Sequence, residues 1–151
     1  MAAKILAVCV SKEKGTQKEN VGSVQVRADH GIEGDAHSGP WHRQVSLLAD
    51  ESIEKMRQKG IALTHGDFGE NIVTQGIDLL ALGIGSTLII GESVVGEVSQ
   101  IGKVCHDRCA IYHQTGDCIM PREGIFLKIL TGGKISAGDH IEIIHSVVPG
   151  N

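Results

Sequence analysis

Glycine divides this chain so frequently that long regular elements have little room to form. The sequence carries 20 glycines but only 3 prolines. This suggests many tight turns, because glycine adopts backbone conformations that other residues resist. Short apolar runs stand between the glycines, beginning with Lys4–Val10 (KILAVCV). Many short strands with regular turn signals are typical of a β-sandwich or a β-barrel. We therefore predict a mostly β fold, a closed or partly open barrel of antiparallel type, with one or two short peripheral helices.

Further strands are predicted where apolar residues alternate with polar ones or form short runs. Val21–Ala28 alternates clearly, and Lys134–Ile144 contains a turn followed by a strand that places Ile141 and Ile143 on one face. Gly124–Leu130 (GIFLKIL) is predicted as a short helix or a strand. The remaining predicted strands are Val45–Leu48, Leu79–Leu82, Thr87–Ile90 and Val94–Ile101.

One helix is predicted, over Glu51–Lys59, and its signals are local. They are Asp50 as the N-cap, Glu51 and Lys55 as an i,i+4 ion pair, Ile53 and Met56 as the buried face, and Gly60 as the stop. Because only two strongly apolar positions lie on it, we expect the helix on the outside of the molecule.

Length and charge limit the classes of protein that this chain could represent. A chain of 151 residues is expected to form one domain, residues 1–151. The formal charge of -4 gives no case for nucleic-acid binding, which normally shows as a basic domain. No apolar run approaches the roughly 18 residues of a membrane span, and the N-terminal run is too short for a signal peptide. We expect a cytoplasmic protein with no membrane partner, whose cysteines are reduced thiols.

Reactive chemistry is expected in Lys103–Leu130, which holds three of the four cysteines. A thiol acts as a nucleophile or a soft-metal ligand only as the thiolate, and neighbouring positive charge lowers its pKa. Cys105 is next to His106, and Cys109 directly follows Arg108. These two cysteines are therefore the better candidates for a reactive centre.

The other two cysteines have less favourable neighbours. Cys118 follows Asp117, whose charge would oppose thiolate formation, so it ranks third. Cys9 lies within a predicted strand and is expected in the core. The competing interpretation is that the other three are also small buried hydrophobic residues, since free cysteine is among the most buried residue types.

A structural zinc site is a further alternative. Cys105 and Cys109 have the spacing of the first half of such a site, and Cys118, His106 or His113 could supply the rest. The sequence contains no second paired motif, however, which weakens this interpretation.

Two glycine loops could line a site. The first, Gly31–Leu48, carries Asp35, His37 and Arg43, and its glycine spacing fits neither a phosphate-binding P-loop nor a dinucleotide fingerprint. The second, His65–Ile72 (HGDFGENI), repeats this style. Ionisable side chains on a glycine-rich loop between strands commonly line a site. The alternative is a surface turn with hydrogen-bonding side chains.

The polar loop Ser11–Asn20 carries Lys12, Lys14 and Lys18. Its composition predicts a solvated hairpin tip. The alternative is a mobile basic flap that helps to hold an anionic ligand.

Several motifs, taken in order, resemble the MOSC family, the domains related to the C-terminal part of molybdenum-cofactor sulfurases. They are GIEGDAH, RQVSLL, GDFGENI, CHDRCAI, GDCIMPREGIF and GGKISAGD. The resemblance covers about Val21 to Ile144 and is that of a small stand-alone bacterial member. It implies a mostly β fold around a distorted barrel, and a role in binding the molybdenum cofactor (molybdopterin) or in handling sulfur for it.

The family's reactive cysteine, which carries sulfur or ligates molybdenum, would fall on Cys105 or Cys109. Cys118 belongs to the pattern of this subgroup and would lie near the cofactor. Soft thiolate suits a sulfur-bound transition metal.

Cationic and loop residues would complete the cofactor site. Arg43, Arg108 and Arg122 are the arginines on motif positions that could hold the pterin phosphate. Asp35 and His37 would form the facing wall. For Arg122 the alternative is a surface salt bridge with an adjacent carboxylate.

Two functional classes follow from the resemblance. The first is a module that carries or sorts the cofactor, or sulfur on it, for molybdoenzymes or cofactor-biosynthesis proteins. The second is a molybdenum-dependent component that reduces N-hydroxylated compounds with a partner reductase. A complete sulfurase would need a sulfur donor with a pyridoxal-phosphate domain, and we do not expect this chain to bind pyridoxal phosphate.

Overall fold

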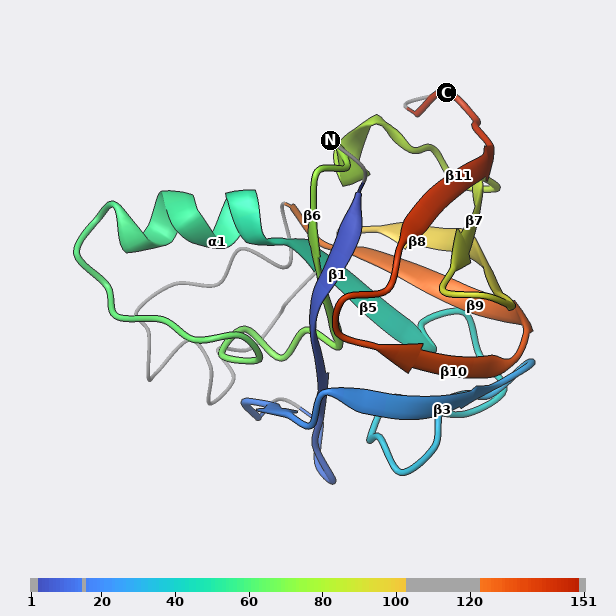
Figure 1. The fold of residues 1–151 in the computed structure, drawn as a ribbon, viewed down its shortest axis with the longest axis horizontal. Coiled ribbons are helices and arrows are strands. Elements are labelled where there is room, and N and C mark those ends of the chain that lie inside the picture. The colour runs from blue at the N-terminus through green and yellow to red at the C-terminus, as the bar shows by residue number, and fades with distance from the viewer. Residues whose placement is uncertain (1–2, 15, 103–122, 150–151) are drawn as a thin grey trace.

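The computed structural model describes residues 3–14, 16–102 and 123–149, and they form a mostly β structure (Figure 1). The strands are β1 (Lys4–Val10), β2 (Glu19–Asn20), β3 (Ser23–Arg27), β4 (Gly31–Ile32), β5 (Val45–Ala49), β6 (Ile72–Gln75), β7 (Thr87–Ile90), β8 (Val94–Ile101), β9 (Ile125–Thr131), β10 (Gly133–Ser136) and β11 (Ile141–His145). One α-helix, α1 (Asp50–Arg57), and one 3-10 turn, η1 (Leu79–Ala81), complete the described elements.

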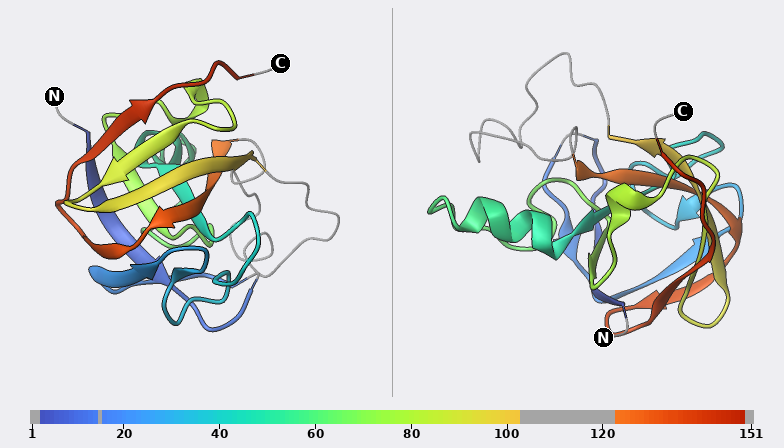
Figure 2. Two further views of the ribbon diagram at one scale, coloured as in Figure 1. Left: turned by 90° about the vertical axis from the view of Figure 1, so that its right-hand side faces the viewer. Right: turned by 90° about the horizontal axis from the view of Figure 1, so that it is seen from above.

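The strands form a sheet of eight in the order β11-β7-β8-β9-β5-β6-β1-β2 and a sheet of three in the order β10-β3-β4. Every pairing is antiparallel except that of β5 with β6. A parallel pair needs a crossover, and α1 with its following loop supplies it. Figures 1 and 2 show α1 projecting from one side of the β structure.

The mostly β class and the peripheral helix are confirmed, but a closed barrel is not. In the described part of the chain the hydrogen-bonded order of the large sheet runs open from β11 to β2. Near its two ends, one bridge joins Lys4 of β1 to His140, the residue before β11. The Ile5 amide beside it binds the Asp139 carbonyl at 2.8 Å. Closure would need a continuous ladder here.

Two apolar clusters lie on opposite faces of the central strands. In β5, Val45 and Leu47 pack into the larger cluster, while Leu48 packs with Ile53 of α1 into the smaller one. Successive strand residues point to opposite faces, so β5 is buried along its whole length. The core is mainly aliphatic, in line with the 3% aromatic content, and Phe68 and Phe126 are its aromatic members among the described residues.

The predicted helix is present but begins differently. Asp50 is the first helical residue, and the N-cap position belongs to Ala49, which makes no side-chain cap. The Asp50 carboxylate accepts hydrogen bonds from Arg57 at 3.1 Å and from His65 at 2.9 Å. These tertiary partners explain why the capping prediction is wrong. The carboxylate binds Arg57 at the end of the helix and His65 in the following loop, and it does not cap the first turn.

The predicted ion pair between Glu51 and Lys55 is also replaced by longer-range contacts. Glu51 accepts the Gly76 amide at 2.9 Å, and Lys55 binds Glu123 at 3.0 Å. The helix is thus tied to both β6 and the start of β9, whereas the buried positions Ile53 and Met56 agree with the prediction.

Two strand predictions need correction. Leu79–Leu82, predicted as a strand, forms the turn η1, because a short apolar run does not by itself distinguish strand from helix. In β11 the predicted apolar face is only half buried, since Ile141 is enclosed while Ile143 is 47% exposed. Gly124–Leu130 takes the strand alternative, as β9.

Gly66 provides a test of how closely the loops pack. Its backbone has φ +98°, its carbonyl accepts the Lys18 amide at 2.8 Å, and a Cβ there would overlap the Lys18 carbonyl oxygen. Gly60 has a similar φ of +89° but open space around the Cβ position.

We expect Gly60→Ala to lower the free energy of unfolding by about 1–2 kcal/mol, from the left-handed conformation alone. Gly66→Ala should lower it by roughly 3 kcal/mol or more, because overlap adds to that strain. Urea unfolding of the two variants measures the difference. Equal losses would contradict the close approach.

Candidate functional site

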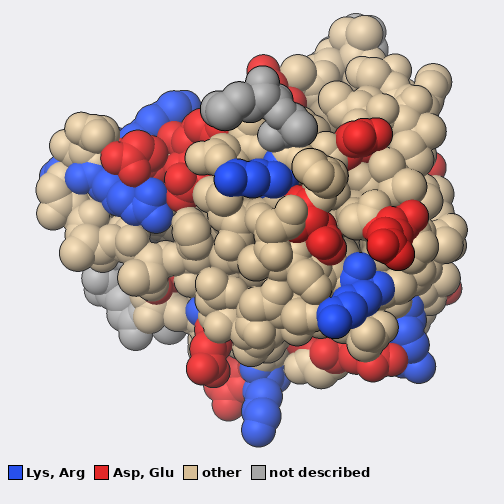
Figure 3. Space-filling view, in the orientation of Figure 1, with Lys and Arg blue, Asp and Glu red and all other residues tan. Residues whose placement is uncertain are grey.

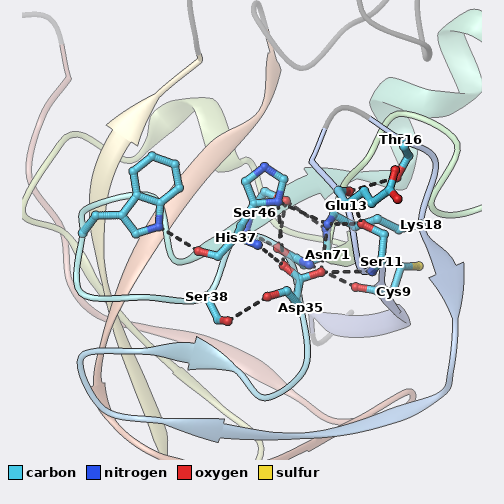
Figure 4. Close-up of polar contacts among 11 residues, drawn as sticks. Cys9, Ser11, Glu13, Thr16, Lys18, Asp35, His37, Ser38, Ser46 and Asn71 are labelled. Carbon is cyan, nitrogen blue, oxygen red and sulfur yellow. Dashed lines mark hydrogen bonds and ion pairs between the residues drawn. The ribbon is translucent and has the colours of Figure 1, made fainter.

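A buried ion pair joins two loops at one end of the molecule (Figure 4). The Lys18 ammonium lies 2.8 Å from Asp35 Oδ1, and both side chains are fully buried. The same oxygen accepts the Ser11 amide at 3.1 Å, and Oδ2 accepts the His37 amide at 3.0 Å. Both carboxylate oxygens of Asp35 are therefore used by the protein itself.

The contacts of Asp35 decide its charge. Burial alone would raise the pKa of the carboxyl, but the hydrogen bonds from the His37 backbone amide and from the Lys18 ammonium outweigh it and hold the pKa well below its usual range. Asp35 stays ionised and serves as the fixed anion around which the loops are arranged.

Lys18 shows that the prediction of a solvated tip for Ser11–Asn20 is wrong at this position. The chain turns back after β1, so the Lys18 side chain points inward, and its amide binds the Gly66 carbonyl at 2.8 Å. The other lysines described in this loop, Lys12 and Lys14, are exposed. Only part of the loop thus behaves as its composition suggests.

Trp41 contacts His37 and Lys14 beside the ion pair. Its indole Nε1 donates to the His37 carbonyl at 2.7 Å, and the two rings are stacked with centroids 6.4 Å apart and planes 5° apart. The Lys14 ammonium lies 4.5 Å from the Trp41 ring centroid. The predicted site residue His37 is therefore clamped by a residue that the sequence did not single out.

Arg43, two residues before β5, also lies over the Trp41 ring. Its guanidinium carbon lies 4.5 Å from the Trp41 centroid and 5.8 Å from that of Phe126. Its Nε is buried without a hydrogen-bond partner, and no carboxylate among the described residues pairs with it. Arg43 is thus a cation against aromatic rings, and its buried Nε has no acceptor within the described part of the chain.

The structure brings together Asp35, His37 and Arg43 of the predicted site. It adds Lys18 and Trp41, which sequence reasoning missed as site residues. The signal for Lys18 was weak, because its partner lies 17 positions away in sequence and its neighbours are polar. For Trp41 the available signal was that it is the only tryptophan in the chain and lies within the first glycine loop.

The second glycine loop, His65–Ile72, is hydrogen-bonded to the first through Asn71 and Ser46. Glu70 is fully buried and accepts the amides of Gly66 at 2.9 Å and Phe68 at 3.0 Å. Asn71 donates to the Cys9 carbonyl at 3.0 Å and accepts the Ser46 amide at the same distance. The loop therefore satisfies its own backbone and fixes the end of β1.

Cys9 lies in this support layer, as predicted for a core thiol. It is fully buried, and burial together with the nearby Glu70 charge raises the pKa of its thiol to about 12. A thiol of this kind is not a candidate nucleophile.

The other predicted site residues lie outside the described residues. They are Cys105, Cys109, Cys118, Arg108 and Arg122, all between positions 103 and 122. The described chain on either side is well anchored: the Gly102 amide binds the Gly124 carbonyl at 2.6 Å, and Glu123 accepts Ser52 at 2.8 Å.

Three other site types receive no support from the described residues. No group of three or more His, Cys, Asp or Glu side chains in residues 3–14, 16–102 and 123–149 could hold a metal ion. None of the helices in these ranges is long and apolar enough to cross a membrane. Acidic and basic side chains are interspersed among the described residues on the face in Figure 3, unlike a nucleic-acid-binding stripe.

Comparison with known proteins gives a consistent result. The family model for the MOSC domain matches residues 34–142 of the 151. The crystal structure of the YuaD protein from Bacillus subtilis superposes with a TM-score of 0.80 at 20% identity, covering 97% of each chain. YiiM from Geobacillus stearothermophilus gives 0.71 at 22% identity, covering 95% of this chain and 75% of its own. YiiM from Escherichia coli gives 0.66 at 20% identity, covering 97% and 71%. No curated protein matches the chain in sequence. At these identities the structural likeness shows the fold.

Native thiol labelling should leave Cys9 unmodified, because the thiol is enclosed and protonated at neutral pH. At least one of Cys105 and Cys109 should be labelled first. Mass spectrometry of labelled peptides, with denatured protein as the control, measures the order. Early modification of Cys9 would contradict its place in the core.

The pH dependence of stability should report on Glu70. Burial raises the pKa of its carboxyl from 4.5 to about 7, against the opposing hydrogen bonds from the loop amides. The folded state therefore binds a proton that the unfolded state has released, and stability falls as pH rises through this window. At about 1.4 kcal/mol per pH unit, the loss is at most roughly 3 kcal/mol.

Glu70→Gln should remove this pH dependence, even though the amide cannot accept both backbone donors. Glu92→Gln, at an exposed turn, is the control and should retain it. Urea unfolding at a series of pH values between 4.5 and 7.5 gives the slopes. A difference between Glu70→Gln and the parent that is constant over this range would contradict the assignment.

Proposed function

This chain belongs to the MOSC domain family, and from that membership we propose that it binds the molybdenum cofactor and carries or sorts it, or sulfur for it, through a reactive cysteine. The recipients would be molybdoenzymes or cofactor-biosynthesis proteins. A separate protein would donate the sulfur. When bound, the cofactor supplies a molybdenum centre, and the protein supplies binding, orientation and electrostatics.

The observation that carries this proposal is the state of Arg43. Its guanidinium rests against the rings of Trp41 and Phe126, and its buried Nε has no acceptor among the described residues. A buried donor without a partner costs free energy, so the position favours a ligand that brings an acceptor. Guanidinium groups recognise phosphate and carboxylate through paired hydrogen bonds. The pterin phosphate is an anion of this type.

Other described residues fit the same ligand. Lys14 contributes a second cation beside Trp41, so two positive charges lie next to the same ring. His37 adds a polar ring stacked on the tryptophan. Asp35, whose oxygens are already bonded, would act by holding Lys18 and His37 in place and would not touch the ligand.

Cys105 and Cys109 are the proposed sulfur carriers or molybdenum ligands. A thiolate is the protein ligand that suits a sulfur-bound transition metal, and a persulfide carrier needs the same low-pKa thiol. Arg108 and Arg122 would add positive charge for the phosphate, and Cys118 would lie close to the cofactor.

Metal analysis of protein made in a molybdenum-cofactor-competent host tests the proposal. We expect molybdenum and the pterin to copurify, without stoichiometric zinc. Zinc in place of molybdenum would favour the structural zinc alternative. Cys105→Ser and Cys109→Ser should differ sharply, one losing cofactor retention or persulfide and the other losing little. If both variants hold cofactor as well as the parent does, the thiolate assignment is wrong.

Arginine variants separate the phosphate contacts from general charge. Arg43→Ala and Arg122→Ala should each weaken cofactor binding roughly ten- to a hundredfold, the range for one charge-assisted hydrogen bond. Arg27→Ala is the matched control, because Arg27 is 60% exposed and already pairs with Glu33. Comparable losses in Arg43→Ala and Arg27→Ala would contradict a specific role for Arg43.

A further inference from the structure

His37 has four polar groups, and the protein uses three of them. Its backbone amide donates to Asp35 Oδ2 at 3.0 Å, and its carbonyl accepts from Trp41 Nε1 at 2.7 Å. Its ring nitrogen Nδ1 lies 3.2 Å from the Lys18 ammonium. The fourth group, Nε2, has no hydrogen-bond partner among the described residues, and the side chain is 19% exposed.

The contact with Lys18 fixes the protonation of the ring. An ammonium has three donors and no acceptor, and Lys18 directs all three at neighbouring atoms. Two go to Ser11 Oγ at 2.9 Å and Asp35 Oδ1 at 2.8 Å. The third reaches His37 Nδ1, which must therefore present a lone pair. In the neutral imidazole the hydrogen then resides on Nε2.

The competing arrangement has Nδ1 donating to Asp35, as in a carboxylate–histidine pair. The distance from Nδ1 to Asp35 Oδ2 is 3.7 Å, which is too long for a hydrogen bond. The oxygen is also already bonded to the His37 amide. The geometry thus favours the tautomer set by Lys18 over the one set by Asp35.

We infer that Lys18 is a positioning residue that holds His37 as the Nε2–H tautomer, so that the ring presents one hydrogen-bond donor to an oxygen of an anionic ligand beside Trp41. This inference deepens the proposed function and rests on it for the ligand. The ligand class is an oxyanion, which can be a free phosphate or the phosphate of a larger molecule. Lys14 and Arg43, both 4.5 Å from the Trp41 centroid, supply the charge.

The tautomer can be measured on the unmodified protein by nitrogen-15 NMR of histidine-labelled material. We expect the His37 resonances to show Nε2 protonated and Nδ1 bare. Assignment uses His37→Gln, which deletes one histidine signal pair. A wild-type spectrum with the hydrogen on Nδ1 overturns the inference without any need for a variant to fold.

Lys18→Met then tests whether Lys18 sets the tautomer, because methionine keeps the length but removes the donors. We expect the Nε2–H form to give way to a mixture or to Nδ1–H. His42, whose Nε2 lies 2.8 Å from Gln100, is the internal control and should not change. An unaltered His37 tautomer in folded Lys18→Met would overturn the positioning role. If Lys18→Met does not fold, Asp35→Asn is used, because it removes the carboxylate and keeps the Lys18 donor. The Nε2–H form should then persist, and a shift of the hydrogen to Nδ1 would overturn the positioning role.

Two substitutions of His37 separate its two nitrogens. Asparagine can retain an acceptor for Lys18 but has no group at the Nε2 position, whereas glutamine can place an amide donor there. Titration with inorganic phosphate and with a phosphate monoester, followed by the fluorescence of the only tryptophan, gives the dissociation constants. His37→Asn should weaken binding about tenfold or more, and His37→Gln by much less.

The results distinguish this inference from the proposed function. Tighter binding of the monoester than of phosphate supports a larger phosphorylated ligand, and equal binding supports the free ion. Phosphate binding that is the same in His37→Asn and the parent overturns the donor role, even if molybdenum copurifies. Loss of binding in His37→Asn without molybdenum in the purified protein supports the donor role and contradicts the proposed function.

Discussion

Lys18 and Asp35 meet 2.8 Å apart with neither side chain exposed to solvent, and the arrangement of the site depends on this contact. Removing two charges from water is costly, and a buried pair often adds little net stability. The pair acts mainly by fixing the geometry of the loops. Loss of either partner would leave an uncompensated buried charge and lower the stability by about 3–5 kcal/mol. One residue of the pair comes from the loop after β1 and the other from the loop after β4. The ion pair therefore fixes how these two loops lie against each other.

The support beneath the pair comes from backbone groups. The Lys18 amide binds the Gly66 carbonyl, and the absence of a side chain at Gly66 is what allows the two backbones to approach. Glu70 in turn accepts the Gly66 amide, so one buried carboxyl orders the loop on which Lys18 rests. The position of His37 therefore depends on a glycine and a glutamate that it does not contact. The second glycine loop therefore supports the site through the backbone contact between Gly66 and Lys18.

The sequence was sufficient for the class of the fold, because strand alternation and glycine turns are local signals. From the glycine loop and the motif positions, the sequence also predicted that Asp35, His37 and Arg43 would lie close together, and the structure places them so. Sequence reasoning failed where the outcome depends on distant partners. Asp50 satisfies every local rule for an N-cap, yet Arg57 and His65 take its carboxylate. Lys18 has the surroundings of a solvated lysine, and only the return of the chain onto Asp35 buries it. Barrel closure likewise depends on how the two end strands of the sheet meet, which no run of residues encodes.

The balance of charge at the site explains what kind of ligand it can receive. Lys18 and Asp35 cancel, so among the described residues beside Trp41 the remaining positive charge belongs to Lys14 and Arg43, in a chain whose formal charge is -4. Both cations rest on an aromatic ring, and a cation–π contact is worth only about 0.5–2 kcal/mol. An arriving oxyanion would not have to break an ion pair with any described residue to bind them. Arg43 is the more enclosed of the two and would fix the position of the anion, while Lys14, on the exposed loop, would add attraction at longer range.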